Sequence, residues 1–121
     1  MTGELQTPND YQQLAARTLI GQPDFKLTDK EVMIVWNAIG LAGEAGEVAD
    51  YVKKAIFHRQ GIDSFRLKKE LGDVLWYVAA LCTKLNLTMQ EVMDHNIDKL
   101  KARYPEGYSH ERSVYRKGNA E

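Results

Sequence analysis

Apolar residues recur at helical spacing through most of this 121-residue chain. Between residues 64 and 86, six of them follow one another at intervals of 4, 3, 4, 3 and 4: Leu67, Leu71, Val74, Val78, Leu81 and Leu85. This spacing places all six on one stripe of an α-helix, as in the seam of a helical bundle. No segment has the strict alternation, β-branched clusters or hairpin turns that mark a sheet. The pattern therefore predicts an all-α protein, a bundle of four to five helices.

Local start and stop signals predict where these helices begin and end. Thr28 and Thr88 each have a glutamate three residues later, which is the capping-box spacing of a helix start. Pro8 suits the first turn of a helix, and Gly21 suits the position just after a helix end. We expect helices over residues 8–20, 29–58, 64–86 and 89–103, followed by a polar tail over residues 104–121. Residues 1–121 are accordingly predicted to form a single domain.

The first half of the second helix, "VMIVWNAIG", is apolar on almost every side. A monomeric bundle would leave part of such a helix uncovered, so we expect it to be buried between several helices or against another subunit. The sequence thus predicts a homo-oligomer, either a dimer or a tetramer.

The overall charge argues against some classes of partner. The chain has 16 basic and 17 acidic residues, which favours neither nonspecific binding to nucleic acid nor attachment to an anionic membrane. The N-terminal "MTGELQTPND" lacks the features of a targeting signal, and no run approaches eighteen consecutive apolar residues. The single cysteine, Cys82, fits a reducing compartment. We expect a cytoplasmic protein with no nucleic-acid or membrane partner.

Two pairs of carboxylates border the apolar stripes of the two central helices. Glu44 and Glu47 lie three residues apart on the second helix, and Glu70 and Asp73 repeat this spacing on the third. Such pairs are common on solvated helix faces, which is the plain structural interpretation. Glycine beside both pairs argues against it, because glycine destabilises a helix by about 1 kcal/mol and is usually tolerated where another group approaches closely. These glycines are Gly43, Gly46 and Gly72.

The two helices are predicted to be adjacent and antiparallel, so the four carboxylates can converge across one groove. Their mutual repulsion requires a compensating cation. Carboxylate oxygens in this number suit Mg²⁺ or Mn²⁺ rather than Zn²⁺. Neither pair includes the histidine of a di-iron Glu-x-x-His site. We therefore expect a divalent metal site built from both helices.

Groups that suit phosphate lie near these acids. Lys54 follows the first acidic pair on the same side of its helix, and Asn96, Lys99 and Arg103 form a row along the fourth helix. Each of them singly is compatible with a solvated surface position. Together with four carboxylates, they indicate a site where acids hold metal ions and cations hold phosphate oxygens. This combination points to phosphoanhydride chemistry.

Two residues on the second helix are candidates for nucleobase recognition. Trp36 and Asn37 precede the acids and lie broadly in line with them, so they can stack on and hydrogen-bond to a base. A core position is the more common place for a tryptophan. The sequence leaves both interpretations open.

Three blocks of the chain resemble the MazG-like branch of the all-α nucleoside triphosphate pyrophosphohydrolases: "GLAGEAGEVADYVKK", "KKELGDVLWYVAALCTKLNL" and "HNIDKLKARYPEGYS". They occur in the family's order, and the resemblance spans residues 32–109. The family signature, Glu-x-x-Glu followed by Glu-x-x-Asp, is matched by Glu44, Glu47, Glu70 and Asp73. The family's polar block on the last helix corresponds to Asn96, Lys99, Arg103 and Tyr104.

The resemblance implies an enzyme that uses Mg²⁺, with Mn²⁺ as a substitute, to cleave a nucleoside triphosphate to the monophosphate and pyrophosphate. It also implies that the four signature carboxylates bind the metal and that more than one subunit completes the bundle. Glu44 is favoured as general base, although Glu47 is equally suited by position. Lys54, Lys99 and Arg103 would stabilise charge on the pyrophosphate. House-cleaning of nucleotide pools is a compatible role.

Two alternatives stay open. One is a non-catalytic helical module that binds nucleotide, metal or another protein, although such a module has no evident use for four acids beside a core. The other is an enzyme dedicated to one substrate, such as a dUTP or dCTP pyrophosphatase or a phosphoribosyl-ATP pyrophosphatase. A melting temperature that does not respond to Mg²⁺ or Mn²⁺ would speak against the metal site.

Overall fold

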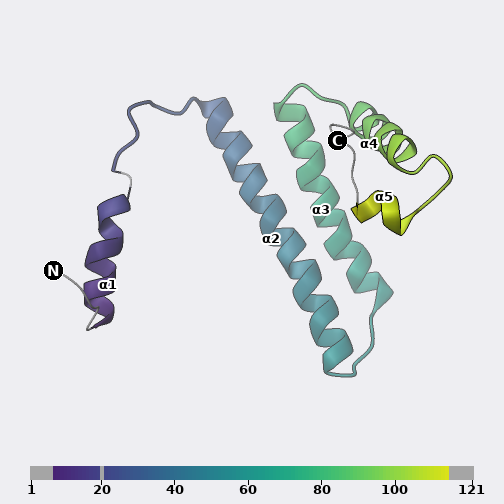
Figure 1. Ribbon diagram of the computed structural model, residues 1–121, viewed down its shortest axis with the longest axis horizontal. Coiled ribbons are helices and arrows are strands. Elements are labelled where there is room, and N and C mark those ends of the chain that lie inside the picture. Colours follow the sequence, from purple (N-terminus) through teal and green to yellow (C-terminus); the bar gives the residue numbers. More distant parts are fainter. Residues whose placement is uncertain (1–6, 20, 115–121) are drawn as a thin grey trace.

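The computed structural model describes residues 7–19 and 21–114, and it is helical throughout these ranges apart from the connections (Figure 1). Its elements in chain order are α1 (Pro8–Ala15), the 3-10 helix η1 (Ala16–Thr18), α2 (Asp29–Phe57), α3 (Ser64–Lys84), α4 (Met89–Arg103) and α5 (His110–Val114). The described residues contain no β-strand, only an isolated bridge between Pro105 and Gly107. The all-α prediction is confirmed. The predicted tail over 104–121 includes the short helix α5, and its residues 115–121 lie outside the described ranges.

Two of the predicted helices begin where the capping boxes placed them. The backbone N–H of Glu31 donates to Thr28 Oγ1 at 3.1 Å, and the N–H of Thr28 donates to Glu31 Oε1 at 2.9 Å. Thr88 makes the same reciprocal pair with Glu91 at the start of α4. These bonds satisfy backbone donors that the first helical turn leaves without partners. Local chemistry is therefore sufficient to fix both starts.

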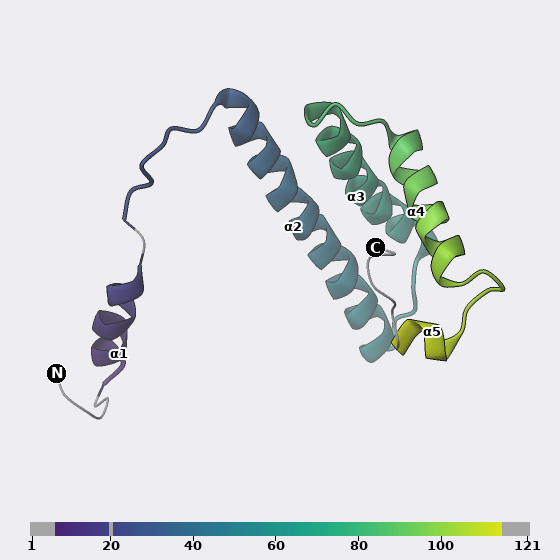
Figure 2. The same ribbon diagram turned by 45° about the horizontal axis from the view of Figure 1, so that its top comes forward.

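The first helix is shorter than its pattern predicted. α1 ends at Ala15 and tightens into η1, whereas we expected one helix over residues 8–20. The Thr18 hydroxyl donates to the carbonyl of Ala15 at 3.1 Å and so replaces a helical donor there. α1 and η1 stand apart from the other helices (Figures 1 and 2). A helix without a packed face gains little from elongation, which explains the early end.

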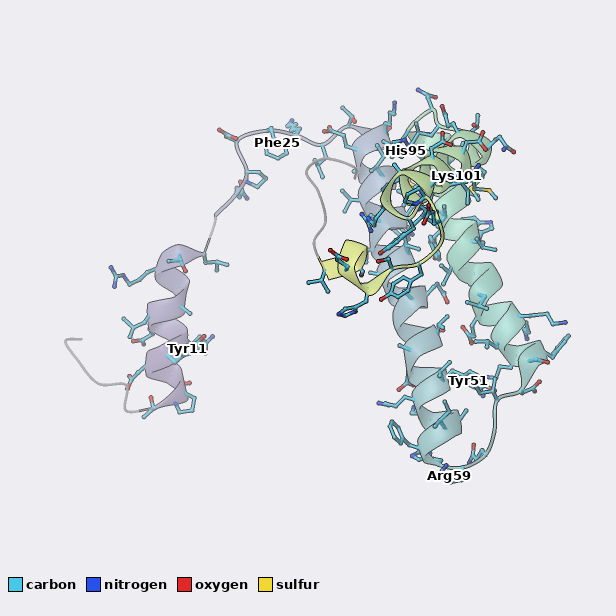
Figure 3. The ribbon with its side chains drawn as sticks, turned by 45° about the vertical axis from the view of Figure 1, so that its right-hand side comes forward. Tyr11, Phe25, Tyr51, Arg59, His95 and Lys101 are labelled. Atoms are coloured by element: carbon cyan, nitrogen blue, oxygen red, sulfur yellow. The ribbon has the colours of Figure 1, made fainter. Side chains whose placement is uncertain are left out.

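α2 and α3 form a long antiparallel hairpin that is the main packed unit of the chain (Figure 1). At the closed end, Arg59 takes a left-handed backbone conformation with φ 58°, and the N–H of Gln60 donates to the carbonyl of Ala55 at 3.0 Å. Tyr51 ties this end together, because its hydroxyl accepts the backbone N–H of Asp63 at 2.7 Å (Figure 3). The hairpin thus holds the acid-bearing turns of the two helices in a fixed register.

The single chain has a very small core. Among the described residues, only Asn37, Ala55 and Cys82 are buried. Two members of the predicted α3 seam, Leu71 and Leu85, are each 46% exposed. The chain exposes 10539 Å², whereas a compact monomer of 13.8 kDa exposes about 6600 Å². The predicted bundle is therefore not closed within one chain.

α2 is unusually apolar for a helix with so little cover. Among the described residues it is the one helix long and apolar enough, by length and composition alone, to cross a membrane. The mostly buried core helix of a soluble protein passes the same test, as does a signal sequence near the N-terminus. α2 also carries Glu44, Glu47, Asp50, Lys53 and Lys54 in its second half.

One glycine in α2 has a packing role. A Cβ added to Gly40 would overlap the ring of Tyr77 on α3, so the two helices approach closely only because residue 40 has no side chain. The close approach that we predicted at Gly43, Gly46 and Gly72 does not occur within the chain, since an added Cβ at each meets nothing within 4 Å. Those three positions face away from the hairpin contact.

Gly40→Ala is expected to destabilise the chain. Overpacking against Tyr77 costs about 1–3 kcal/mol, and the better helix propensity of alanine returns about 1 kcal/mol. The net loss should appear as a lower midpoint in chemical denaturation followed by circular dichroism. Gly72→Ala is the matched control, because it makes the same change in open space and should be neutral or stabilising. Equal midpoints for the two variants would contradict the assigned contact.

Candidate metal and phosphate site

Three carboxylates from two helices meet on one side of the hairpin. Glu44 and Glu47 come from α2 and Glu70 from α3, and one oxygen from each lies within 4.8 Å of the others. Glu44 and Glu70 are half-buried, whereas Glu47 is exposed. The predicted convergence across the two helices therefore involves these three acids.

Asp73, the fourth acid of the predicted set, is exposed and does not belong to this group. It lies one turn further along α3 than Glu70. Its charge nevertheless acts on the cluster, because it contributes to the raised pKa of Glu44. Asp73 thus borders the three-acid group.

Glu44 is the member of the cluster whose ionised form is disfavoured by its surroundings. Its Oε2 has almost no solvent contact and no hydrogen-bond partner among the described residues. Partial burial raises the pKa of this carboxyl above its ordinary value of 4.5, and the charges of Glu47, Asp73 and Glu70 raise it further. A buried carboxylate oxygen that accepts no hydrogen bond lies next to two more carboxylates. Oxygen ligands of this kind suit a hard divalent cation. The residues present fit a Mg²⁺ or Mn²⁺ ion.

The raised pKa of Glu44 predicts a pH-dependent stability in the metal-free chain. Because the folded chain holds this proton to higher pH than the unfolded chain does, the free energy of unfolding falls as pH rises above 4.5. Glu44→Gln removes that loss. With a chelator present, we expect the variant to melt above the wild type at pH 7, and the difference to disappear below pH 4.5.

The exposed Glu106 provides the control for this comparison. Glu106→Gln removes a carboxylate that does not belong to the cluster. The melting temperature of this variant should therefore follow that of the wild type at both pH values. A Glu44→Gln variant that melts below the wild type at pH 7 without metal would contradict the account of the cluster.

Lys54 lies beside the cluster and is held by an acid of its own helix. Its Nζ is 2.8 Å from Asp50 Oδ2, and Lys53 Nζ is 3.5 Å from the other oxygen of the same carboxylate. The hydrogen bond with Lys54 holds the pKa of Asp50 below its ordinary range. Asp50, whose role the sequence left unassigned, therefore orients Lys54.

A cavity of about 520 Å³ extends from the acids toward the closed end of the hairpin. Glu47 and Glu70 line it, as does Lys54. Its other lining residues are Asp50, Tyr51, Ala55, His58, Gln60, Gly61, Asp63 and Arg66. The acids and the first phosphate-binding candidate thus share one hollow surface.

The predicted residues on α4 are not brought to this surface within one chain. α4 has few contacts with α2 or α3, so Asn96 and Lys99 stay apart from the acids. Arg103 lies over the ring of Tyr104, with its guanidinium carbon 6.0 Å from the ring centroid. The Tyr104 ring in turn packs on Tyr108 at 5.5 Å. The α4 residues of the predicted site therefore do not join the acids within one chain.

Trp36 and Asn37 point to different surroundings. Trp36 is 65% exposed and lines a second, shallow cavity with Ile39 and Gly40. Asn37 is buried, and its Nδ2 donates to the carbonyl of Met33 at 2.7 Å. Neither of the cavities described among residues 7–19 and 21–114 is lined by both Trp36 and Asn37, which the sequence placed together.

Arg66 is a site residue that sequence reasoning missed. It precedes Glu70 by four residues and therefore lies on the same side of α3, one turn closer to the hairpin turn. That spacing was available in the sequence. Its pairing with Tyr51, described below, was not, because it depends on the register of α2 against α3.

The fold and the site together define a class of protein. It is an all-α protein in which carboxylates from both helices of a hairpin form a candidate site for a divalent cation, beside a cavity lined by cations. Residues 37–108 match the family model described as the MazG nucleotide pyrophosphohydrolase domain. The chain belongs to this family.

A phage protein is similar to most of the chain. The Gene 37 protein of Mycobacterium phage L5 is 35% identical over 102 residues, which cover 81% of this chain and 90% of that protein. No solved structure matches the chain significantly. The family assignment therefore relies on the domain match and the phage relative.

Proposed function

We propose that this protein is a Mg²⁺-dependent nucleoside triphosphate pyrophosphohydrolase that converts a triphosphate and water into the monophosphate and pyrophosphate. The observation that carries the proposal is the convergence of Glu44, whose Oε2 is buried and unpartnered among the described residues, with Glu47 and Glu70 in a chain of the MazG family. Repulsion among three acids is costly unless the protein uses it to bind a cation.

Glu44, Glu47 and Glu70 would hold the cation, with Asp73 at the edge of the site. When bound there, Mg²⁺ would neutralise the carboxylates and the phosphate oxygens and would make a nearby water more acidic. Mn²⁺ has similar ligand preferences and would substitute.

The chain's own residues account for the proton and the leaving group. In the proposed reaction the water oxygen forms a bond to the α-phosphorus, and the bond from that phosphorus to the α,β-bridging oxygen breaks. Glu44 accepts the proton of the water, and its Oε2, which has no hydrogen-bond partner among the described residues, is the acceptor available for it. The bridging oxygen leaves with its electron pair as part of pyrophosphate. Lys54 stabilises the charge that develops there.

A second copy of the chain would cover the outer face of α2. Val32, Val35, Trp36 and Ile39 are 41% to 67% exposed there, and the helical repeat continues this face through Gly43 and Gly46. The chain's surface exceeds that of a compact monomer by about 4000 Å², whereas one partner in a standard interface loses about 800 Å². We propose a cytoplasmic homo-oligomer, in which protein rather than lipid covers this face.

Self-association also gives α4 a role. Because α4 has few contacts with α2 or α3 in one chain, its Asn96 and Lys99 would approach the acids of a partner instead. A site shared between copies would then contain the acids of one chain and the α4 cations of the other.

A substrate panel tests the proposed function. The full chain is incubated with Mg²⁺ and each canonical and modified nucleoside triphosphate, and the products are separated by chromatography. Monophosphate with pyrophosphate is the expected result, and hydrolysis of one triphosphate alone would indicate a dedicated enzyme. Diphosphate with phosphate, or no turnover of any substrate, would contradict the proposal.

A further inference from the structure

The cavity beyond the acids has a cation on each wall. Lys54 follows Glu47 on α2, and Arg66 precedes Glu70 on α3. Since the two helices are antiparallel, both cations lie on the side of the acids that is nearer the hairpin turn. Any ligand that binds at the acids and extends in this direction passes between the two cations.

Arg66 is held in place without the use of its hydrogen-bond donors. Its guanidinium carbon lies 4.5 Å from the centroid of the Tyr51 ring, an attractive cation–π contact. Tyr51 is itself fixed by the 2.7 Å bond that its hydroxyl accepts from the N–H of Asp63 (Figure 3). Arg66 makes no ion pair within the described residues. Stacking occupies the face of the guanidinium and leaves its N–H edge available for a forked contact.

The neighbouring acids decide when an anion can bind here. Glu47, Asp50, Asp63 and Glu70 also line the cavity, so the metal-free chain presents more negative than positive charge to a ligand. Asp50 is already paired with lysines. The two charges of a divalent cation at the cluster would offset those of Glu47 and Glu70. Anion binding in this cavity should therefore require the metal.

We infer that Arg66 binds the terminal phosphates of the substrate, opposite Lys54, and so directs the leaving pyrophosphate toward the closed end of the hairpin. The nucleoside then lies toward the open end of the hairpin. The inference rests on the proposed function for the identity of the ligand. It adds a residue that positions the leaving group and a direction for the substrate along the hairpin.

Direct binding of the product tests the role of Arg66. Inorganic pyrophosphate, AMP and dUMP are titrated separately into the full chain by calorimetry, with and without Mg²⁺. For Arg66→Gln we expect the Kd of pyrophosphate with Mg²⁺ to rise by about 10-fold or more, as for a lost charge-assisted contact. The Kd of the monophosphate should change by less than about twofold. Without Mg²⁺, pyrophosphate should bind far more weakly to every variant.

Arg59→Gln is the matched control, because Arg59 is a basic residue of the adjoining hairpin turn and does not line the cavity. It removes the same net charge and should leave both affinities unchanged. Should Arg66→Gln lose its helical spectrum, Arg66→Lys replaces it in the test, with an expected loss of about threefold or more because lysine lacks the guanidinium fork.

Two kinds of failure are distinguishable. If the wild type hydrolyses triphosphates but the Arg66 variants keep their pyrophosphate affinity, or lose monophosphate affinity equally, the inference is wrong and the proposed function stands. If the wild type neither binds pyrophosphate with Mg²⁺ nor hydrolyses any triphosphate, the proposed function fails and the inference fails with it.

Discussion

Glu47→Ala is expected to lower turnover by about 10³-fold or more, because it removes an oxygen donor of the metal site on which the chemistry depends. Glu47 is exposed and lies within 4.8 Å of both other acids, so truncation creates no cavity and relieves repulsion on Glu44. The folded state should therefore survive. Steady-state release of pyrophosphate measures turnover, and circular dichroism checks that the helical content is unchanged.

The same variant should lose its response to metal. A ligand that binds only the folded state raises the melting temperature, so Mg²⁺ should stabilise the wild type and leave Glu47→Ala nearly unaffected. Glu106→Ala, at an exposed position away from the cluster, controls for removal of one negative charge. A Glu47→Ala protein that retains full turnover, or one that unfolds, would show that this acid has been assigned the wrong role.

The helices were predictable to the extent that their signals are local. The Thr28 and Thr88 capping boxes act within four residues, and the structure contains both. The first helix was predicted too long because Pro8 and Gly21 mark limits without saying whether a partner packs between them. Helix ends that depend on packing require knowledge of the neighbours.

The site was predictable in composition and less so in arrangement. Spacing within one helix indicates that Glu44 and Glu47 lie on the same side of α2. Which acid of α3 joins them depends on the axial register of α2 against α3, and this register places Glu70 in the group and Asp73 outside it. The same register places Arg66 on Tyr51. It also makes Gly40 the glycine that allows close packing, while Gly43 and Gly46 are left open.

The placement of one chain against another is also needed to explain the position of the polar residues on α4. The row formed by Asn96, Lys99 and Arg103 follows from helical spacing alone, and the structure preserves it on one helix. What the sequence could not supply is the surface that this row faces, because in one chain α4 packs little on the hairpin. A shared site between copies reconciles the row with the acids.

Ile39→Glu is expected to dissociate the proposed oligomer. Ile39 is 67% exposed at the centre of the outer apolar face of α2, so a charge placed there would be buried without a partner if a second copy covers it. Light scattering coupled to size-exclusion chromatography should show the wild type as a dimer or larger and the variant as a smaller species. Ile39→Leu keeps the apolar volume without the charge and should keep the wild-type mass.

Loss of assembly should carry loss of activity with it. Ile39 is outside the acid cluster and its cavity, but it shares a shallow cavity with Trp36, so dilution of the wild type is the decisive comparison. If α4 cations act across the interface, turnover per chain falls with the oligomeric fraction, both in this variant and in the wild type on dilution. A wild type that is monomeric at micromolar concentration, or a monomeric variant with full turnover, would exclude the shared site. In that case α4 would have to reach the acids of its own chain through a rearrangement of the α3–α4 connection.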